Sequence, residues 1–187
     1  MIDDKLLTLT CGTPSGVPFS ISTTPIDLQA NPDVTDAFQL IESTQRLIAR
    51  FIVTQAFATA NNANVQMYLV ASSSSTFAAG NAILAAATGP LEVYGSPPTS
   101  TYFYGYKAAQ LTLGTTIDVP IASINNAAQA GVSVKSLRYL GAGLSIPNYA
   151  IGTTLTAGTI ECRIVSDAGL SDSTKLLSHF NSGMKVV

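Results

Sequence analysis

Apolar and polar residues alternate along several short stretches of this chain, which is the pattern of β-strands with one covered face. Two stretches show it most clearly, and each has one wholly apolar face. The residues on these faces are Leu47, Ala49, Phe51 and Val53 in 46–54, and Ile160, Cys162 and Ile164 in 158–165. The opposite face of 46–54 is mixed, with arginine, isoleucine and threonine.

Further short stretches bounded by Gly, Pro, Ser or Asn bring the prediction to about nine or ten strands. They are 6–11, 17–22, 65–70, 82–87, 91–94, 102–111, 116–121 and 134–144. The pair Asn61 and Asn62 suits a turn because asparagine tolerates left-handed backbone angles, so 46–54 and 65–70 are predicted to form a hairpin. Pro120 has no N–H to donate to a ladder, which predicts that 116–121 lies at a sheet edge or ends there.

Helical patterns are confined to 33–41 and to the tail segment 171–180. Many short strands, separated by turns at intervals of about 8 to 12 residues, favour a sandwich or barrel over an α/β arrangement. We therefore predict an all-β, jelly-roll β-sandwich with extended N- and C-terminal arms and little helix. The predicted domain covers 1–170, and 171–187 forms a C-terminal arm.

Charged residues make up only 11% of the chain, where about 25% is typical. The surface must therefore be rich in Ser, Thr, Ala, Asn and Gln. Interface cores are depleted of charge, which predicts a surface partly covered by other subunits. The nine basic residues are scattered, so no nucleic-acid site is expected. No apolar run reaches the roughly 18–20 residues that span a bilayer, so no membrane partner is expected.

The chain offers few groups for catalysis. Its single histidine, His179, lies in the tail, whereas a hydrolytic triad needs a base beside its nucleophile. Zinc sites need several Cys or His ligands, so no catalytic residue, cofactor or metal site is predicted. Cys11 and Cys162 are far apart in sequence; a disulfide is possible, but buried free thiols are favoured. The glycines of Gly141-Ala142-Gly143 predict a bulge or close packing within a strand.

Two groups of residues are candidates for an interface. Tyrosines between Tyr94 and Tyr106 suit contact with a protein, core packing or carbohydrate. Apolar residues near both termini suit arms that reach a neighbouring subunit, or segments that fold back on their own sandwich. The candidate interface residues are Ile2, Leu6, Leu7, Tyr102, Tyr104, Tyr106, Leu176, Leu177 and Phe180.

Several motifs recur together in a fixed order along the chain. They are Met1-Ile2-Asp3-Asp4-Lys5-Leu6-Leu7, Ala56-Phe57-Ala58-Thr59, Ala71-Ser72-Ser73-Ser74-Ser75-Thr76-Phe77, Leu113-Gly114-Thr115-Thr116-Ile117-Asp118-Val119-Pro120, Arg138-Tyr139-Leu140 and Thr156-Ala157-Gly158-Thr159-Ile160. In this combination the chain resembles the capsid cement, or decoration, proteins of short-tailed icosahedral bacteriophages, over roughly Met1 to Asp167. The segments 91–105 and 171–187 are longer than that pattern, so no contacts are carried over to them.

The resemblance implies a jelly-roll domain on the outside of the shell, where it clamps neighbouring subunits of the major capsid protein. It also implies a small homo-oligomer, for which we favour a homodimer, with a homotrimer as the other possibility. We therefore expect a structural virion protein on the outer capsid surface, without enzymatic activity or cofactor. The alternative is a carbohydrate-binding jelly-roll module for host-surface recognition, with the tyrosines between Tyr94 and Tyr106 as its stacking platform.

Overall fold

The computed structural model describes residues 8–13, 19–27, 47–59, 61–77, 82–89, 105–121, 138–147 and 152–166. These residues form β-strands and one short 3-10 turn, η2 (Ala108–Gln110). The strands are β1 (Thr8–Gly12), β2 (Phe19–Ile21), β3 (Ile26–Asp27), β4 (Leu47–Thr59), β5 (Asn64–Ser72), β6 (Ala82–Ala87), β7 (Tyr106–Lys107), β8 (Thr116–Pro120), β9 (Tyr139–Ser145) and β10 (Leu155–Ser166). The predicted all-β fold is confirmed. The predicted helices 33–41 and 171–180 and the predicted strand 91–94 lie outside the described residues.

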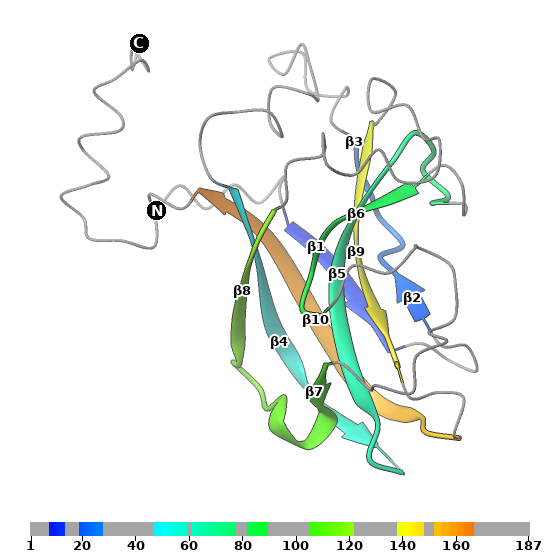
Figure 1. Ribbon diagram of the computed structural model, residues 1–187, viewed down its shortest axis with the longest axis vertical. Helices are drawn as coiled ribbons and strands as arrows, with labels where there is room; N and C mark the ends of the chain where they lie inside the picture. Colours follow the sequence, from blue (N-terminus) through cyan, green and yellow to red (C-terminus); the bar gives the residue numbers. More distant parts are fainter. Residues whose placement is uncertain are drawn as a thin grey trace, which may run out of the picture.

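The strands form two antiparallel sheets packed face to face (Figure 1). One sheet has the order β1-β10-β4-β8. The other has the order β2-β9-β5-β6, and the short strands β3 and β7 pair with β9 and β5. The predicted strand 102–111 is wrong over much of its described part, 105–111, where β7 is followed directly by η2; residues 102–104 lie outside the described residues.

The predicted hairpin between 46–54 and 65–70 is wrong, because β4 and β5 belong to different sheets. Asn62 does adopt a left-handed backbone, with φ of 52°, as expected for this turn. The turn nevertheless carries the chain across the sandwich, and the apolar faces of β4 and β5 meet in one core. The observed hairpin is instead β5 with β6.

The prediction that 116–121 forms an edge strand is confirmed, since β8 pairs only with β4 among the described strands. Val53 of β4 donates to the Thr115 carbonyl at 2.9 Å and accepts from the Gly114 N–H at 2.9 Å. Because hydrogen bonding alternates along an antiparallel pair, Phe51 and Ala49 also face β8, where they pair with Ile117 and Val119. The main-chain groups of Pro120 therefore point to the open edge, where a missing N–H breaks no bond.

The core between the sheets is built from alternate residues of both layers. The apolar faces predicted for 46–54 and 158–165 are confirmed for the side chains that the structure describes, because Ala49, Phe51, Val53, Ile160 and Cys162 are at most 1% exposed. The Leu47 side chain lies outside the description. The opposing layer contributes the buried residues Val65, Met67, Leu69, Ala71, Leu140, Ala142 and Leu144. This two-sided interdigitation is what holds an aligned sandwich together.

The outer face of the second sheet carries a smaller apolar cluster that contains Tyr68, Val70 and Phe77. Here the strand glycines of 141–143 make room for aromatic rings. A Cβ on Gly143 would lie 2.1 Å from Tyr68 Cε2, and one on Gly141 would lie 2.6 Å from Phe77 Cζ. The close packing predicted for these glycines is therefore confirmed, and β5 is buried on both faces.

Candidate interaction surface

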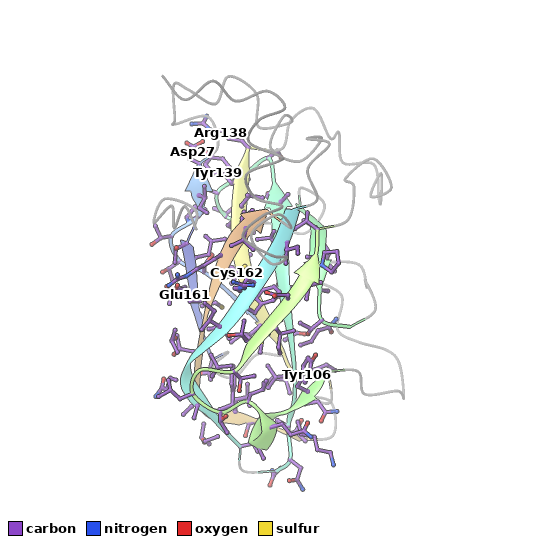
Figure 2. All side chains as sticks on the ribbon, turned by 90° about the vertical axis from the view of Figure 1, so that its left-hand side faces the viewer. Asp27, Tyr106, Arg138, Tyr139, Glu161 and Cys162 are labelled. Atoms are coloured by element: carbon purple, nitrogen blue, oxygen red, sulfur yellow. The ribbon has the colours of Figure 1, made fainter. Side chains whose placement is uncertain are left out.

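Of the interface residues predicted from sequence, Tyr106 is the one that the structure describes. It lies on β7 and is 38% exposed, at the end of the sandwich opposite the Asp27, Arg138 and Tyr139 group (Figure 2). The other predicted interface residues, Ile2, Leu6, Leu7, Tyr102, Tyr104, Leu176, Leu177 and Phe180, lie outside the described residues. Tyr106 is thus exposed enough to contact a partner.

The most exposed large apolar side chain among the described residues is Leu113, which is 70% exposed. It occupies the second position of a turn that the Thr115 N–H closes on the Thr112 carbonyl at 3.0 Å. Gly114, at the third position, has φ of 84°, as a type II turn requires. Leu113 therefore stands at the tip of a tight turn and faces solvent.

This turn is tied to the sandwich on both sides. Leu111, which precedes it, is 1% exposed, and its carbonyl accepts the Phe57 N–H of β4 at 3.1 Å. Gly114 and Thr115, which follow Leu113, are bonded to Val53 of the same strand, at 2.9 Å each. The leucine side chain is therefore presented by a fixed backbone, which lowers the entropy lost when it meets a partner.

Beside the turn, the alternation of β4 breaks down, because Thr54, Gln55 and Ala56 are all exposed. The register between β4 and β10 shifts repeatedly here, between Leu155 and Ile160. Such bulges change the direction of neighbouring side chains. The exposed residues Thr54, Gln55, Ala56, Thr112, Leu113 and Gly114 form what we call the Leu113 surface, and none of the six is charged. Sequence reasoning did not single out Leu113, although a leucine directly before a turn glycine was a usable signal.

Most charged side chains of the described residues form ion pairs away from the Leu113 surface, and the exposed Lys107, directly before η2, is in none of these pairs. Arg50 holds Asp118 through two contacts, Nε to Oδ1 at 2.8 Å and Nη2 to Oδ2 at 3.0 Å, and this hydrogen bonding raises the pKa of Arg50. Arg138 holds Asp27 in the same way, at 2.8 and 2.6 Å, with its guanidinium 5.1 Å from the Tyr139 ring centre. Such pairs join neighbouring strands and are not arranged as an acid and a base around a cleft.

Other chemistry finds little support in the part of the chain that the structure describes. Within it, no three His, Cys, Asp or Glu side chains gather where they could hold a metal ion. Among the same residues there is no apolar helix of the length needed to cross a bilayer. His179 lies outside the described residues.

The two cysteines are buried and free, as favoured from sequence. Leu9 of β1 lies opposite Cys162, and Cys11 lies opposite Ile160, so the two thiols are diagonal neighbours on paired strands. Diagonal positions are about 7–8 Å apart, beyond the usual span of a disulfide. Burial raises the pKa of both thiols, and most strongly that of Cys162. Figure 2 shows Cys162 within the sandwich. Neither thiol is therefore set up as a nucleophile.

We expect the free energy of unfolding to fall with pH above the ordinary thiol pKa of 9.0, in part because of Cys162. Above that pH the unfolded chain loses the thiol proton whereas the folded chain keeps it, so the unfolded state binds fewer protons. Each such thiol contributes a slope of up to about 1.4 kcal/mol per pH unit. Urea unfolding between pH 8 and 10.5 should give a shallower fall for Cys162→Ala than for the wild type, whatever their stabilities at pH 7. Equal slopes would contradict this.

The chain matches no model of a protein family and no curated protein. The function is therefore argued from the residues of this chain.

Proposed function

We propose that this protein is a structural cement protein that binds the outside of a bacteriophage capsid and stabilises it by clamping neighbouring subunits of the major capsid protein. The observation that carries the proposal is the Leu113 surface, a rigid, uncharged and partly apolar surface on a sandwich most of whose described charges are paired with one another. A surface of this kind binds another protein by shape and apolar fit.

The strand order supports the jelly-roll part of the proposal. With β3 and β7 set aside, the eight remaining strands pair as β1 with β10, β2 with β9, β4 with β8 and β5 with β6. The first strand thus pairs with the last, the second with the last but one, and so on inward. We infer a jelly roll, because this nested pairing is what a long two-stranded ribbon forms when it is rolled into two sheets.

The energy of cementing would come from modest contacts that are repeated many times. Fully burying a leucine side chain is worth about 1.5–3 kcal/mol, part of which offsets the loss of rotational and translational freedom on binding. A subunit that contacts several neighbours at once gains avidity without any stronger single contact. In this proposal the protein acts on the virion surface, without catalysis or cofactor, and it associates with the capsid protein and with itself.

The test is to mix the purified protein with undecorated shells and to image them by electron microscopy. Wild-type protein should add density at regular positions of the outer lattice. Leu113→Asp should weaken this binding by about tenfold or more, because a carboxylate cannot enter an apolar contact without losing its hydration. Leu113 is mostly solvent-exposed in the free protein, so the variant should unfold at the temperature of the wild type.

Ser75→Asp is the matched control. Ser75 is exposed in the connection that follows β5, whereas β7 and the Leu113 surface lie near the start of that strand. This variant carries the same added charge and should bind the shell as the wild type does. Shells that remain bare after incubation with wild-type protein would contradict the proposed function. Equal binding by Leu113→Asp would leave the function in place but exclude the Leu113 surface.

Carbohydrate binding stays a hypothesis. Of the tyrosines on which it depends, the structure describes Tyr106, a residue that is 38% exposed on the short strand β7. Saturable binding to a glycan array that Tyr106→Ala abolishes would favour it over capsid binding.

A further inference from the structure

Three of the four sheet edges in the described part of the chain have features that hinder pairing with a further strand. At β8 the edge contains Pro120, and at β6 an extra residue, Ala85, makes a bulge in the ladder with β5. The edge formed by β2 and β3 consists of strands of only three and two residues. Prolines, bulges and very short strands are the means by which natural sheets avoid joining edge to edge.

The edge at β1 has none of these features. Its five residues pair with β10 in one unbroken register, from Thr8 opposite Arg163 to Gly12 opposite Thr159. The strand contains no charged residue and no proline. Thr10 and Gly12 are exposed, and no atom of the described residues lies within 4 Å of a Cβ built on Gly12. Within the part of the chain that the structure describes, the β1 edge is therefore regular and accessible.

The direction of the main-chain groups of β1 follows from the alternation of hydrogen bonds along the sheet. The main-chain N–H and C=O of Val53 bond to the β8 side, so the main-chain groups of its neighbour on β4, Ile52, point to β10. Ile52 pairs with Glu161, so the main-chain groups of Glu161 point to β4. Those of the neighbouring residue, Ile160, then point to β1. The residue of β1 opposite Ile160 is Cys11, so the main-chain groups of Cys11 face β10.

The main-chain groups of Thr8, Thr10 and Gly12 therefore point away from β10, toward the open edge. A separate observation agrees with this direction. The Gly12 carbonyl accepts a hydrogen bond from the Ser20 hydroxyl of β2, in the other sheet, at 2.7 Å. Cys11 Sγ also lies 3.5 Å from this carbonyl oxygen, but a thiol is a weak donor and can bond the Ser20 hydroxyl instead, at 3.3 Å. A carbonyl oxygen has two lone pairs, so Gly12 can still accept a bond from a main-chain N–H.

We propose that two copies of this chain associate through their β1 strands, which pair antiparallel about a two-fold axis at Thr10. Thr10 then lies opposite Thr10 of the second copy, and Thr8 lies opposite Gly12. When two paired residues both direct their main-chain N–H and C=O groups toward the partner strand, they exchange two N–H···O bonds. The four-stranded sheets of the two copies become one continuous sheet across the axis.

A second copy fits this edge better than an unrelated strand because of the symmetry of the pairing. In an antiparallel pair of identical strands the central residue faces itself, so a central charge would repel its own copy. The central residue here is an uncharged threonine, and threonine opposite threonine is a favourable cross-strand pair. Among the described residues, the nearest charges on the same face are Arg163 and Glu161 of β10, which already form an ion pair within the chain.

This inference rests on the self-association proposed above and names the surface for it. It concerns the free protein, so its test needs no capsid. A monomer that still decorates shells would overturn the β1 contact alone, whereas a β1 dimer that leaves shells bare would overturn the capsid proposal alone.

The test is the mass of the protein in solution, measured by sedimentation velocity and light scattering, for wild type, Thr10→Lys and Thr10→Asp. Wild type should have twice the chain mass of 19.4 kDa. Each variant should be monomeric at a concentration where wild type is dimeric, because like charges then meet at the axis. An equimolar mixture of the two variants should regain the dimer, because lysine then faces aspartate.

Thr116→Lys is the matched control, since Thr116 is an exposed threonine on the opposite edge strand, β8. This variant should remain dimeric, and circular dichroism should show that all the variants keep the sheet. A wild-type monomer or trimer overturns the proposal, since a two-fold strand pair cannot close a ring of three. A dimeric Thr10→Lys or a mixture that stays monomeric does so as well.

Discussion

Replacing Gly143 by alanine should lower the free energy of unfolding by about 3 kcal/mol, the upper range for forcing extra volume into a packed site. The new Cβ would lie 2.1 and 2.4 Å from two ring atoms of Tyr68 and 2.8 Å from the Ser20 carbonyl oxygen. The ring cannot easily move away, because Tyr68 is 5% exposed and its hydroxyl donates to the Ser20 carbonyl at 3.0 Å. Thermal unfolding should then occur roughly 6–12 °C lower.

Gly12→Ala is the control for this prediction, since a Cβ on Gly12 meets no atom of the described residues within 4 Å. Because Gly12 belongs to the proposed β1 contact, both alanine variants are compared in the Thr10→Lys monomer. Gly12→Ala should unfold within about 0.5 kcal/mol of that monomer. A second comparison isolates the cause. In a Tyr68→Leu background the ring is absent, and the cost of Gly143→Ala should shrink by about 1 kcal/mol or more. A Gly143→Ala protein as stable as Gly12→Ala would mean that the ring does not lie over the strand.

The second large effect is expected at Phe51, in the middle of β4. Phe51→Ala should cost about 3–5 kcal/mol in urea unfolding, because the side chain is 0% exposed and its removal leaves a cavity between the sheets. Phe51 lies on the central strand pair of its sheet, with Cys162 on one side and Ile117 on the other. Few neighbours can collapse into such a site without breaking a ladder.

Ile52→Ala is the matched comparison, one residue further along the same strand. Ile52 faces outward and is only half-buried, so its loss should cost about 1 kcal/mol. The contrast between two adjacent positions tests the alternation itself. Equal losses at the two positions would contradict the inward face assigned to β4.

The strands themselves were predictable because period-two alternation is a local property. Ala49, Phe51 and Val53 on one strand, and Ile160 and Cys162 on the other, had to share a face once each segment was extended. The partners of these strands were not predictable in the same way. Asn62 takes the left-handed backbone that a hairpin turn uses, yet the chain crosses to the other sheet there. Nothing local distinguishes these two outcomes, since both bury the same apolar face.

The candidate surface, too, was predictable from local sequence only in part. Tyr106 was predictable as an exposed aromatic residue, whereas the importance of Leu113 depends on Val53 and Phe57, which hold its turn from a distant part of the chain. The open edge at β1 likewise has no signature within 8–12. It becomes visible only when β1 is compared with the proline of β8 and the bulge of β6.

By itself, the amino-acid sequence determined that this protein is built of strands, that its surface is poor in charge and that Pro120 belongs at an edge. These follow from side-chain alternation, composition and a missing N–H, which act on each residue or its immediate neighbours. Tertiary structure alone decided which strands pair, which glycines lie beneath aromatic rings and which edge stays open. Those features depend on contacts between segments up to a hundred or more residues apart, such as the Arg138 and Asp27 pair, and such contacts exist only once both sheets have formed.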